Sequence, residues 1–563
     1  MIVFAAAFVL TLAGFVKAIY VSLDIDESYL VACAYRLSAG DRLFADMWEP
    51  HQLASLIPSL FVRAYLAARG SAEGIVIFLR ITGALIHLAI GVILYAFAKK
   101  RTKPDIALWV FLIHLNFLPK WVQSLDFELM AYQAVLGSCM LLISLCDELS
   151  GERRRYKVYV KYFAAGLLLL ISMLSYPTLI LLYPAFLAGI MICHGRDMRA
   201  AGASFFTAGA LIPGLIVLFI IFRSVPSGEF ISSILNVFTN PSHATQSFGK
   251  RMAEYAAEGL RALALWAVIT ALAYLVIIIC RKGKKAGEDL VLSMVVTFII
   301  LQAVMIFGCI FLDKNQFFMQ GRYAALIVPA VMVSLKHREK YGKLVWLAFI
   351  PGVLCVLSVM TVTNMNAGTA WSKAMPAVLA AVYVLASEFS GEGDRLKGYT
   401  CFLAFGALLA GLFLCRLGLL RVTGCLPVTI KADLERVSEG PAKGIFITKP
   451  FADAANREYE ALQGLYSAED NVLYVGAEML LYLDYPCRIA SPSVEGTTIY
   501  DEYFLRYYDE HPERLPDYVV YDRHYSEIYE YRRYPQEYVI DEWISGNYPN
   551  VLLETPDLTV YVK

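Results

Sequence analysis

The sequence DIDESYLVACAYRLSAGDRLFADMWEPHQLASLIP occupies residues 24–58 and directly follows a first apolar segment. It carries six acidic side chains, which are Asp24, Asp26, Glu27, Asp41, Asp46 and Glu49. Carboxylates beside a membrane are costly to desolvate, so a cluster of them at its surface indicates a functional site. We expect the rest of the chain to hold this segment over a cavity.

The composition is that of a membrane protein. Of 563 residues, 58% are hydrophobic and 17% are charged, with a mean hydropathy of +0.56. A bilayer-spanning helix needs about 20 apolar residues, and about thirteen segments approach this criterion. Their ranges are 1–21, 75–98, 106–119, 127–146, 158–174, 176–193, 201–222, 261–280, 290–312, 322–335, 343–362, 374–388 and 399–420. The sequence therefore predicts a polytopic α-helical membrane protein.

The charges of the loops predict the orientation of these spans. The short loops near 99–104, 147–157, 194–200, 281–288, 336–343 and 389–397 carry 20 Lys and Arg. The opposite loops are more than twice as long in total and carry 10. Basic loops stay in the cytoplasm. We therefore expect a cytoplasmic N-terminus, with the loop 22–74 and the C-terminal region outside.

The chain changes character after residue 421. Residues 422–563 contain 12 Lys and Arg against 25 Asp and Glu, a net charge of −13, which argues against nucleic-acid binding. Strand-like runs at 443–449, 471–476, 487–490 and 517–522, with a helical pattern at 450–465, predict a small α/β domain with a partly parallel sheet. We expect a transmembrane catalytic domain over 1–421 and an extracytoplasmic accessory domain over 422–563.

The first outer loop is predicted to contain two helices, at 28–38 and 52–68, that lie along the membrane surface. The first closes at Ala39-Gly40. Cys425 and Cys487 would both face an oxidising exterior, where they form a disulfide or stay as two free thiols. The sequence does not decide between these alternatives.

The same loop resembles the first outer loop of integral-membrane glycosyltransferases of the GT-C class, in particular the protein O-mannosyltransferase and aminoarabinose-transferase group. The residues that carry the resemblance are Asp26-Glu27, Gly40, Phe44, Asp46 and Pro50-His51. Where the family commonly has Lys-Pro-Pro, this chain has Glu-Pro-His. The predicted spans and the outer C-terminal domain also resemble that class.

The resemblance implies an enzyme that transfers a sugar from a polyprenyl-phosphate donor to an acceptor hydroxyl on the outer face. An outer-loop Asp is the general base in this class, and Asp26 matches its position. Such a base must reach the acceptor hydroxyl by a hydrogen bond. Asp24 and Glu27 are further catalytic candidates beside it. Alternatively, these two acids cap the helix that follows.

No cofactor follows with certainty from the sequence. Asp24 and Asp26 form a D-x-D pair whose hard oxygen ligands could hold a divalent cation. No CxxC or Cys/His metal spacing occurs.

Further candidates for substrate binding lie in three places. Asp46 and His51 belong to the first outer loop. Lys120, Asp126 and Glu128 belong to the second, where the two acids either line the same cavity or cap the span that follows.

Arg322 and Tyr323 open a later span on the outer side, as in the same glycosyltransferases, where the Arg faces the carrier phosphate. A guanidinium binds phosphate through two hydrogen bonds. The alternative is an arginine that extends its head group to the membrane surface.

Three functions are compatible with this sequence. The first is the glycosyltransferase, with a polyprenyl-phosphate sugar as donor, a glycan, lipid or protein as acceptor, and membrane lipid around it. The second is a transporter or flippase of a lipid-linked sugar, which would show mid-membrane charges and internal repeats. The third is an envelope polysaccharide polymerase or ligase. We expect the first, in the bacterial plasma (inner) membrane, with its active site outside.

Overall fold

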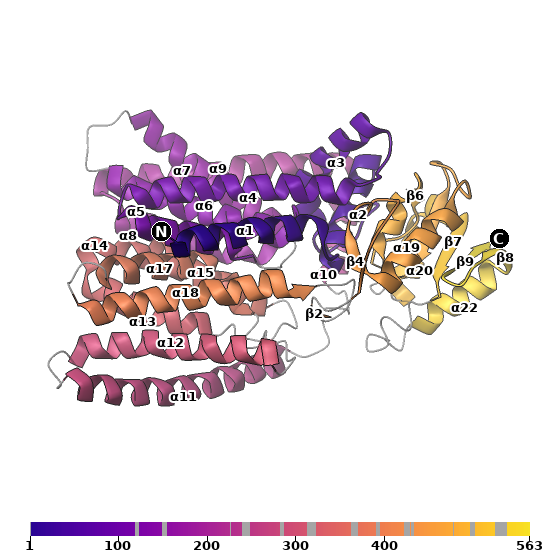
Figure 1. The fold of residues 1–563 in the computed structure, drawn as a ribbon. Helices are drawn as coiled ribbons and strands as arrows, with labels where there is room; N and C mark the ends of the chain where they lie inside the picture. Colours follow the sequence, from indigo (N-terminus) through magenta and orange to yellow (C-terminus); the bar gives the residue numbers. More distant parts are fainter. Residues whose placement is uncertain are drawn as a thin grey trace.

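A computed structural model describes most of the chain. It does not describe residues 1, 119–122, 149–154, 226, 239–247, 282–285, 312–321, 362–369, 390–393, 421–427, 430–432, 477, 496–500 and 524–536. Lys120 and Cys425 therefore lie outside the described residues, and so does the predicted pairing of Cys425 with Cys487. Figure 1 shows a bundle of long helices with a small sheet-containing region at one end.

Helices occupy all thirteen segments predicted as spans. They are α1 (Ile2–Tyr20), α4 (Ile75–Lys99), α5 (Pro104–Asn116), α6 (Phe127–Glu148), α7 (Arg155–Ser175), η2 and α8 (Pro177–Leu181, Leu182–Cys193), α9 (Arg196–Ser224), α11 (Phe248–Arg281), α12 (Ala286–Phe311), α13 (Arg322–Lys336), α14 with η5 and α15 (Arg338–Leu344, Val345–Phe349, Ile350–Met360), α17 (Met375–Phe389) and α18 (Arg395–Gly418). A further helix, α10 (Ser227–Phe238), precedes α11.

Fewer helices are long enough to span a membrane than the sequence predicts. Nine helices in the described part of the chain are long and apolar enough to cross a membrane. The apolar helices Pro104–Asn116, Pro177–Cys193 and Met375–Phe389 are shorter. An integral membrane protein with many helices is therefore confirmed, whereas the count of thirteen is not.

The segment 24–58 folds into two short helices that lead into a third. α2 (Ile25–Ala39) ends at Gly40, whose φ of 112° is accessible to glycine without strain. η1 (Gln52–Ser55) and α3 (Leu56–Arg69) follow. Helices were predicted at both places, but α2 is not a surface helix, because its residues from Glu27 to Arg36 are all buried.

The C-terminal region contains a five-stranded mixed sheet in the order β6-β5-β7-β9-β8. Its strands are β5 (Asn471–Val475), β6 (Arg488–Ile489), β7 (Tyr518–Asp522), β8 (Asn550–Glu554) and β9 (Leu558–Val562). β5 is parallel to β6 and β7, and β9 is antiparallel to β7 and β8. The predicted partly parallel sheet is therefore present, with a terminal hairpin that was not predicted.

Smaller elements surround this sheet. The predicted strand at 443–449 is β4 (Phe446–Thr448), which pairs with β3 (Leu434–Arg436) in a separate antiparallel pair. β1 (Leu419–Leu420) and β2 (Val428–Thr429) form another pair. The helices are α19 (Lys449–Leu462), η7 (Met479–Leu483), α20 (Asp501–Glu510), η9 (Pro512–Arg514) and α22 (Glu537–Asn547).

The loop predicted to lie outside, residues 22–74, packs against the C-terminal region. Trp48 is 1% exposed and packs in the same hydrophobic cluster as Leu473, Val519 and Tyr507, with its ring 5.2 Å from that of Tyr507. Its backbone N–H donates to the carbonyl of Pro492 at 2.8 Å. The loop that resembles a catalytic segment is therefore packed against the C-terminal region.

Candidate functional site

The three acids at the start of α2 have different surroundings. Asp24 is the N-cap, and its carboxylate accepts a hydrogen bond from the backbone N–H of Asp26 at 3.0 Å. Glu27 is 1% exposed and accepts from Nε of Arg80 at 2.8 Å and from Nη2 at 2.5 Å. Asp24 and Glu27 therefore fix the start of the helix and its place against α4.

Asp26 lies between these two acids and lines a cavity of about 160 Å³. The other lining residues are Ile25, Tyr29, Pro50, His51, Phe127, Glu128, Tyr176, Met479 and Glu495. They come from α2, the loop before η1, α6, the kink before η2 and the C-terminal region. Three of the candidate residues from the sequence, Asp26, His51 and Glu128, thus meet at one cavity.

Aromatic rings form one wall of this cavity. The ring of His51 stacks on Phe127, with centroids 4.1 Å apart and planes 3° from parallel. Tyr176 lies 5.4 Å from the same imidazole, also measured between centroids. The hydroxyl of Tyr29 accepts from the backbone N–H of His51 at 3.4 Å. Burial, together with the neighbouring Cys33 and Glu49, raises the pKa of Tyr29 well above its usual value, so Tyr29 stays neutral at physiological pH.

The two acids at the start of α6, Asp126 and Glu128, also have different surroundings. Asp126 accepts from the backbone N–H of Leu129 at 2.5 Å, which is the capping alternative. Glu128 lines the cavity and forms a buried ion pair with Lys373. Lys373, only 2% exposed, ends the short helix η6 (Trp371–Lys373) and was not singled out from the sequence.

Asp46 and Glu49 do not line this cavity. Asp46 accepts two hydrogen bonds from the Arg42 guanidinium, both at 2.9 Å, and one from its backbone N–H at 2.7 Å. Burial alone would raise the pKa of Asp46, but these bonds and the nearby Arg514 lower it overall. Glu49 is fully buried and accepts from Ser493 Oγ at 2.8 Å and from the Val494 N–H at 2.6 Å.

Arg322 begins α13 and is buried at 4% exposure. Its Nε donates to Oε1 of Gln302, and its Nη2 lies 3.4 Å from the hydroxyl of Tyr323. The Tyr323 ring is 5.2 Å from that of Phe117, directly after α5. Arg322 does not line the Asp26 cavity.

A second buried arginine, Arg416 near the end of α18, also contacts the end of α5. Its Nη1 donates to the carbonyl of Leu115 at 2.5 Å, and its Nη2 donates to Oε1 of Gln123 at 2.8 Å. Gln123 is four residues from Phe127, which forms the wall of the Asp26 cavity. The sequence indicated only the end of a span at this position.

Neither Arg322 nor Arg416 forms an ion pair with a carboxylate within the described ranges of the chain. Four buried donor atoms around them have no hydrogen-bond acceptor there either. They are Nη1 of Arg322, Nε of Arg416, Nε2 of Gln302 and Nε2 of Gln123. Buried donors are normally satisfied, so this group is suited to an anionic ligand.

The residues do not form a ready metal site. In the part of the chain that the structure describes, no group of three or more His, Cys, Asp or Glu side chains is placed to hold an ion. Asp24 of the D-x-D pair is 2% exposed and turned to the backbone of its own helix. We therefore derive no step through a divalent cation.

The cavity includes residues that the sequence did not identify as functional. Tyr176 was interpreted only as part of a structural break, and Met479 and Glu495 belong to a region expected to be accessory. The break at Pro177 was a usable signal, because it frees backbone groups that need a polar or buried site. Nothing in the local sequence connects residues 479 and 495 with residue 26.

No protein-family model matches the chain, and no curated protein matches its sequence. Among solved structures, the chain is similar to the archaeal oligosaccharyltransferase AglB from Archaeoglobus fulgidus in complex with an inhibitory peptide and a dolichol-phosphate. The TM-score is 0.47 at 12% identity, over 93% of this chain and 70% of that one. The oligosaccharyltransferase of the same organism in complex with Zn and sulfate gives 0.46 at 12% identity, over 93% and 68%.

Proposed function

We propose that the chain is an integral-membrane glycosyltransferase that moves a sugar from a polyprenyl-phosphate donor to an acceptor hydroxyl. The observation that carries the proposal is the division of roles among three neighbouring acids. Asp24 caps the helix and Glu27 pairs with Arg80, and Asp26 lines one cavity together with His51 and Glu128. A carboxylate so placed can accept the proton of an acceptor hydroxyl.

In the proposed step, the acceptor oxygen bonds to the anomeric carbon of the donor sugar as the bond from that carbon to the phosphate oxygen breaks. The electron pair of the broken bond leaves with the polyprenyl phosphate, and the acceptor proton passes to Asp26. Arg322 binds the carrier phosphate through its buried donors, with Tyr323 beside it and Arg416 as a second cation. Preorganised donors stabilise the charge that develops on the leaving group.

The remaining residues orient the reactants in this proposal. Glu128 and His51 form the walls against which the acceptor lies, and Lys120 belongs to the same outer loop as Glu128. Asp46 holds the loop in place through Arg42. The proposal covers hexosyl or pentosyl donors and glycan, lipid or protein acceptors. It places the protein in the bacterial plasma membrane with the cavity and C-terminal region outside, as the loop charges favour.

The test is release of polyprenyl phosphate from a panel of polyprenyl-phosphate sugars by purified protein in lipid, with an envelope fraction as acceptor. We expect the wild type to release the carrier and Asp26→Asn to release it more slowly by about a hundredfold or more. Asp24→Asn is the matched control, because asparagine caps a helix as well as aspartate does. Its rate should stay near that of the wild type.

Two results would change the assignment. Unaltered release by Asp26→Asn would remove Asp26 as the base. Movement of the intact lipid-linked sugar across the bilayer without any release would indicate a transporter, and growth of a carrier-linked glycan would indicate a polymerase or ligase.

A further inference from the structure

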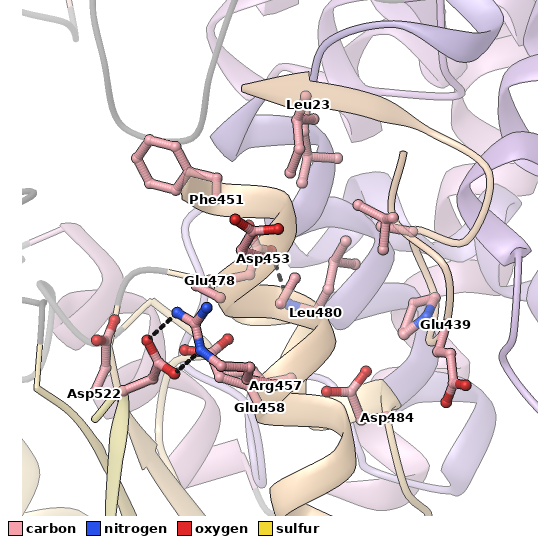
Figure 2. A pocket seen from close by; sticks show the side chains of 18 of the residues that line it. Leu23, Glu439, Phe451, Asp453, Arg457, Glu458, Glu478, Leu480, Asp484 and Asp522 are labelled. Carbon is pink, nitrogen blue, oxygen red and sulfur yellow. Dashed lines mark hydrogen bonds and ion pairs between the residues drawn. The ribbon is translucent and has the colours of Figure 1, made fainter. Parts of the chain in front are cut away.

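A larger cavity, of about 430 Å³, lies where the C-terminal region meets the chain between α1 and α2. Figure 2 shows its lining, which includes Leu23 from that connection, several residues of α19 and η7, and Asp522 at the end of β7. It shares no lining residue with the Asp26 cavity. A ligand bound in this larger cavity would therefore be separate from the proposed glycosyl transfer.

The lining of this cavity is strongly acidic. Seven of its residues are Asp or Glu, and Arg457 is the basic residue among them. The Arg457 guanidinium is engaged by one of these acids, since its Nε and Nη2 donate to the Asp557 carboxylate at 2.7 and 2.8 Å. Most of the acidic charge that faces the cavity is therefore not neutralised by the arginine.

Glu458 is the residue that points to a ligand. It is 7% exposed and lines the cavity from α19, the helix that carries Arg457 (Figure 2). No hydrogen bond or ion pair engages its carboxylate among the residues that the structure describes. A buried carboxylate without a partner is costly, because desolvation penalises its charged form. Burial raises the pKa of Glu458, and the nearby carboxylates of Asp522 and Asp484 raise it further.

The remaining walls are apolar, and they include Leu23, Phe451, Leu480 and Leu481. Within the described residues, no three metal-binding side chains converge here or elsewhere. The volume falls in the usual range for small organic ligands, about 300–1,000 Å³. Acidic groups beside apolar walls match a protonated amine on an aliphatic chain better than a hydrated metal ion.

We propose that this cavity binds a small aliphatic ammonium compound, with its protonated amine against Glu458 and Asp522 and its methylene chain against Phe451 and Leu480. A diamine of about five carbons carries both features. The site is separate from the proposed base and would give the outer region a ligand of its own.

The experiment is calorimetric titration of the full-length protein in detergent micelles with cadaverine (1,5-diaminopentane). Pentane-1,5-diol serves as the uncharged analogue, and Mg²⁺ tests the metal alternative. We expect cadaverine to bind the wild type, Glu458→Gln to weaken that binding at least tenfold, and the diol not to bind. Glu460→Gln is the matched control, because Glu460 is exposed on the same helix and does not line the cavity. Its affinity should equal that of the wild type.

A second readout does not depend on the stability of one variant. Because the pKa of Glu458 is raised, binding of a cation should release protons, and titrations in buffers of different ionisation enthalpy measure that number. Facing Glu458 are Asp522 of β7, Asp484 and Glu478 around η7, and Asp557 before β9, with Arg457 on its own helix. Asp484→Asn should also weaken binding.

Absence of cadaverine binding, equal binding by wild type and Glu458→Gln, or Mg²⁺ binding in place of cadaverine would each overturn the proposal. Cadaverine binding without proton release would overturn it as well.

Discussion

The protein buries arginines in two regions and pairs them differently. Around α2, Arg80 holds Glu27, and Arg36 donates to Asp41 at 2.8 Å with Glu49 3.6 Å away. Beside the end of α5, Arg322 and Arg416 contact only neutral acceptors in the described chain, such as Gln302 and Gln123. All four of these arginines are at most 4% exposed. A buried charge needs compensation. Arg80 and Arg36 are compensated by carboxylates of the chain and stabilise the fold, whereas Arg322 and Arg416 are suited to an anion from outside the chain.

The largest expected effect comes from Arg80→Met, which would leave Glu27 buried without its cation. Loss of one partner of a buried ion pair costs about 3–5 kcal/mol. Chemical unfolding in mixed micelles measures this loss of stability. Arg63→Met, at an exposed position of α3, is the control and should change the free energy of unfolding by less than about 0.5 kcal/mol. The double variant Glu27→Gln with Arg80→Met should recover part of the loss, and a double variant as unstable as Arg80→Met would argue against the pair.

Arg322→Met should behave in the opposite way. It strands no carboxylate, so its unfolding should match that of the wild type, while carrier release falls about 10²–10³-fold, as for loss of a transition-state donor. Release and unfolding are measured on the same preparation. If Arg322→Met is destabilised as strongly as Arg80→Met, the contrast between the two regions is lost.

The ionisation of Glu49 tests whether the charges around α2 are compensated. Burial raises the pKa of Glu49 to about 7, although Arg36 and hydrogen bonds from Ser493, Val494 and Tyr29 offset part of the effect. The folded protein then keeps this proton to higher pH than the unfolded chain, whose Glu pKa is about 4.3. Stability should therefore fall as the pH rises from about 4.3 to 7, by at most about 4 kcal/mol, and then level off.

Glu49→Gln should remove this component, because it cannot titrate. The measurement is the difference in free energy of unfolding between wild type and Glu49→Gln across pH 5–8. A constant difference over that range would show that Glu49 is already ionised at low pH.

The smallest effect is expected at the N-cap of α2. Asp24→Ala should lower the free energy of unfolding by about 1 kcal/mol, because the N–H of Asp26 loses its acceptor. Asp24→Asn should lower the free energy of unfolding by only a few tenths of a kcal/mol, since asparagine retains an acceptor oxygen. Equal losses in both variants would mean that the charge of Asp24, and not its cap, is what matters.

The sequence predicted the helices well because hydropathy and helix ends are local properties. The segments for α1, α4 and α12 and the stop at Gly40 follow from apolar runs and one glycine. It was less informative about burial. α2 has the composition of a surface helix, yet the C-terminal region covers it through η7.

The candidate site was predictable only in part for the same reason. Asp26, His51 and Glu128 were singled out locally and meet at one cavity. The partner of a buried acid can lie far along the chain, as Arg80 does for Glu27 and Lys373 for Glu128. No local pattern reveals those partners, and the contribution of Glu495 was invisible for the same reason.

The most direct measurement of the central claim is the thermal unfolding of wild type, Arg322→Met and Arg80→Met with and without added polyprenyl phosphate. If Arg322 binds the carrier phosphate, saturating carrier should stabilise the wild type and Arg80→Met alike, by about 2.7 kcal/mol at one hundred times Kd. This assignment is the hypothesis under test. It predicts little or no stabilisation of Arg322→Met. Equal stabilisation of all three proteins would contradict the assignment of the uncompensated arginine to the carrier phosphate.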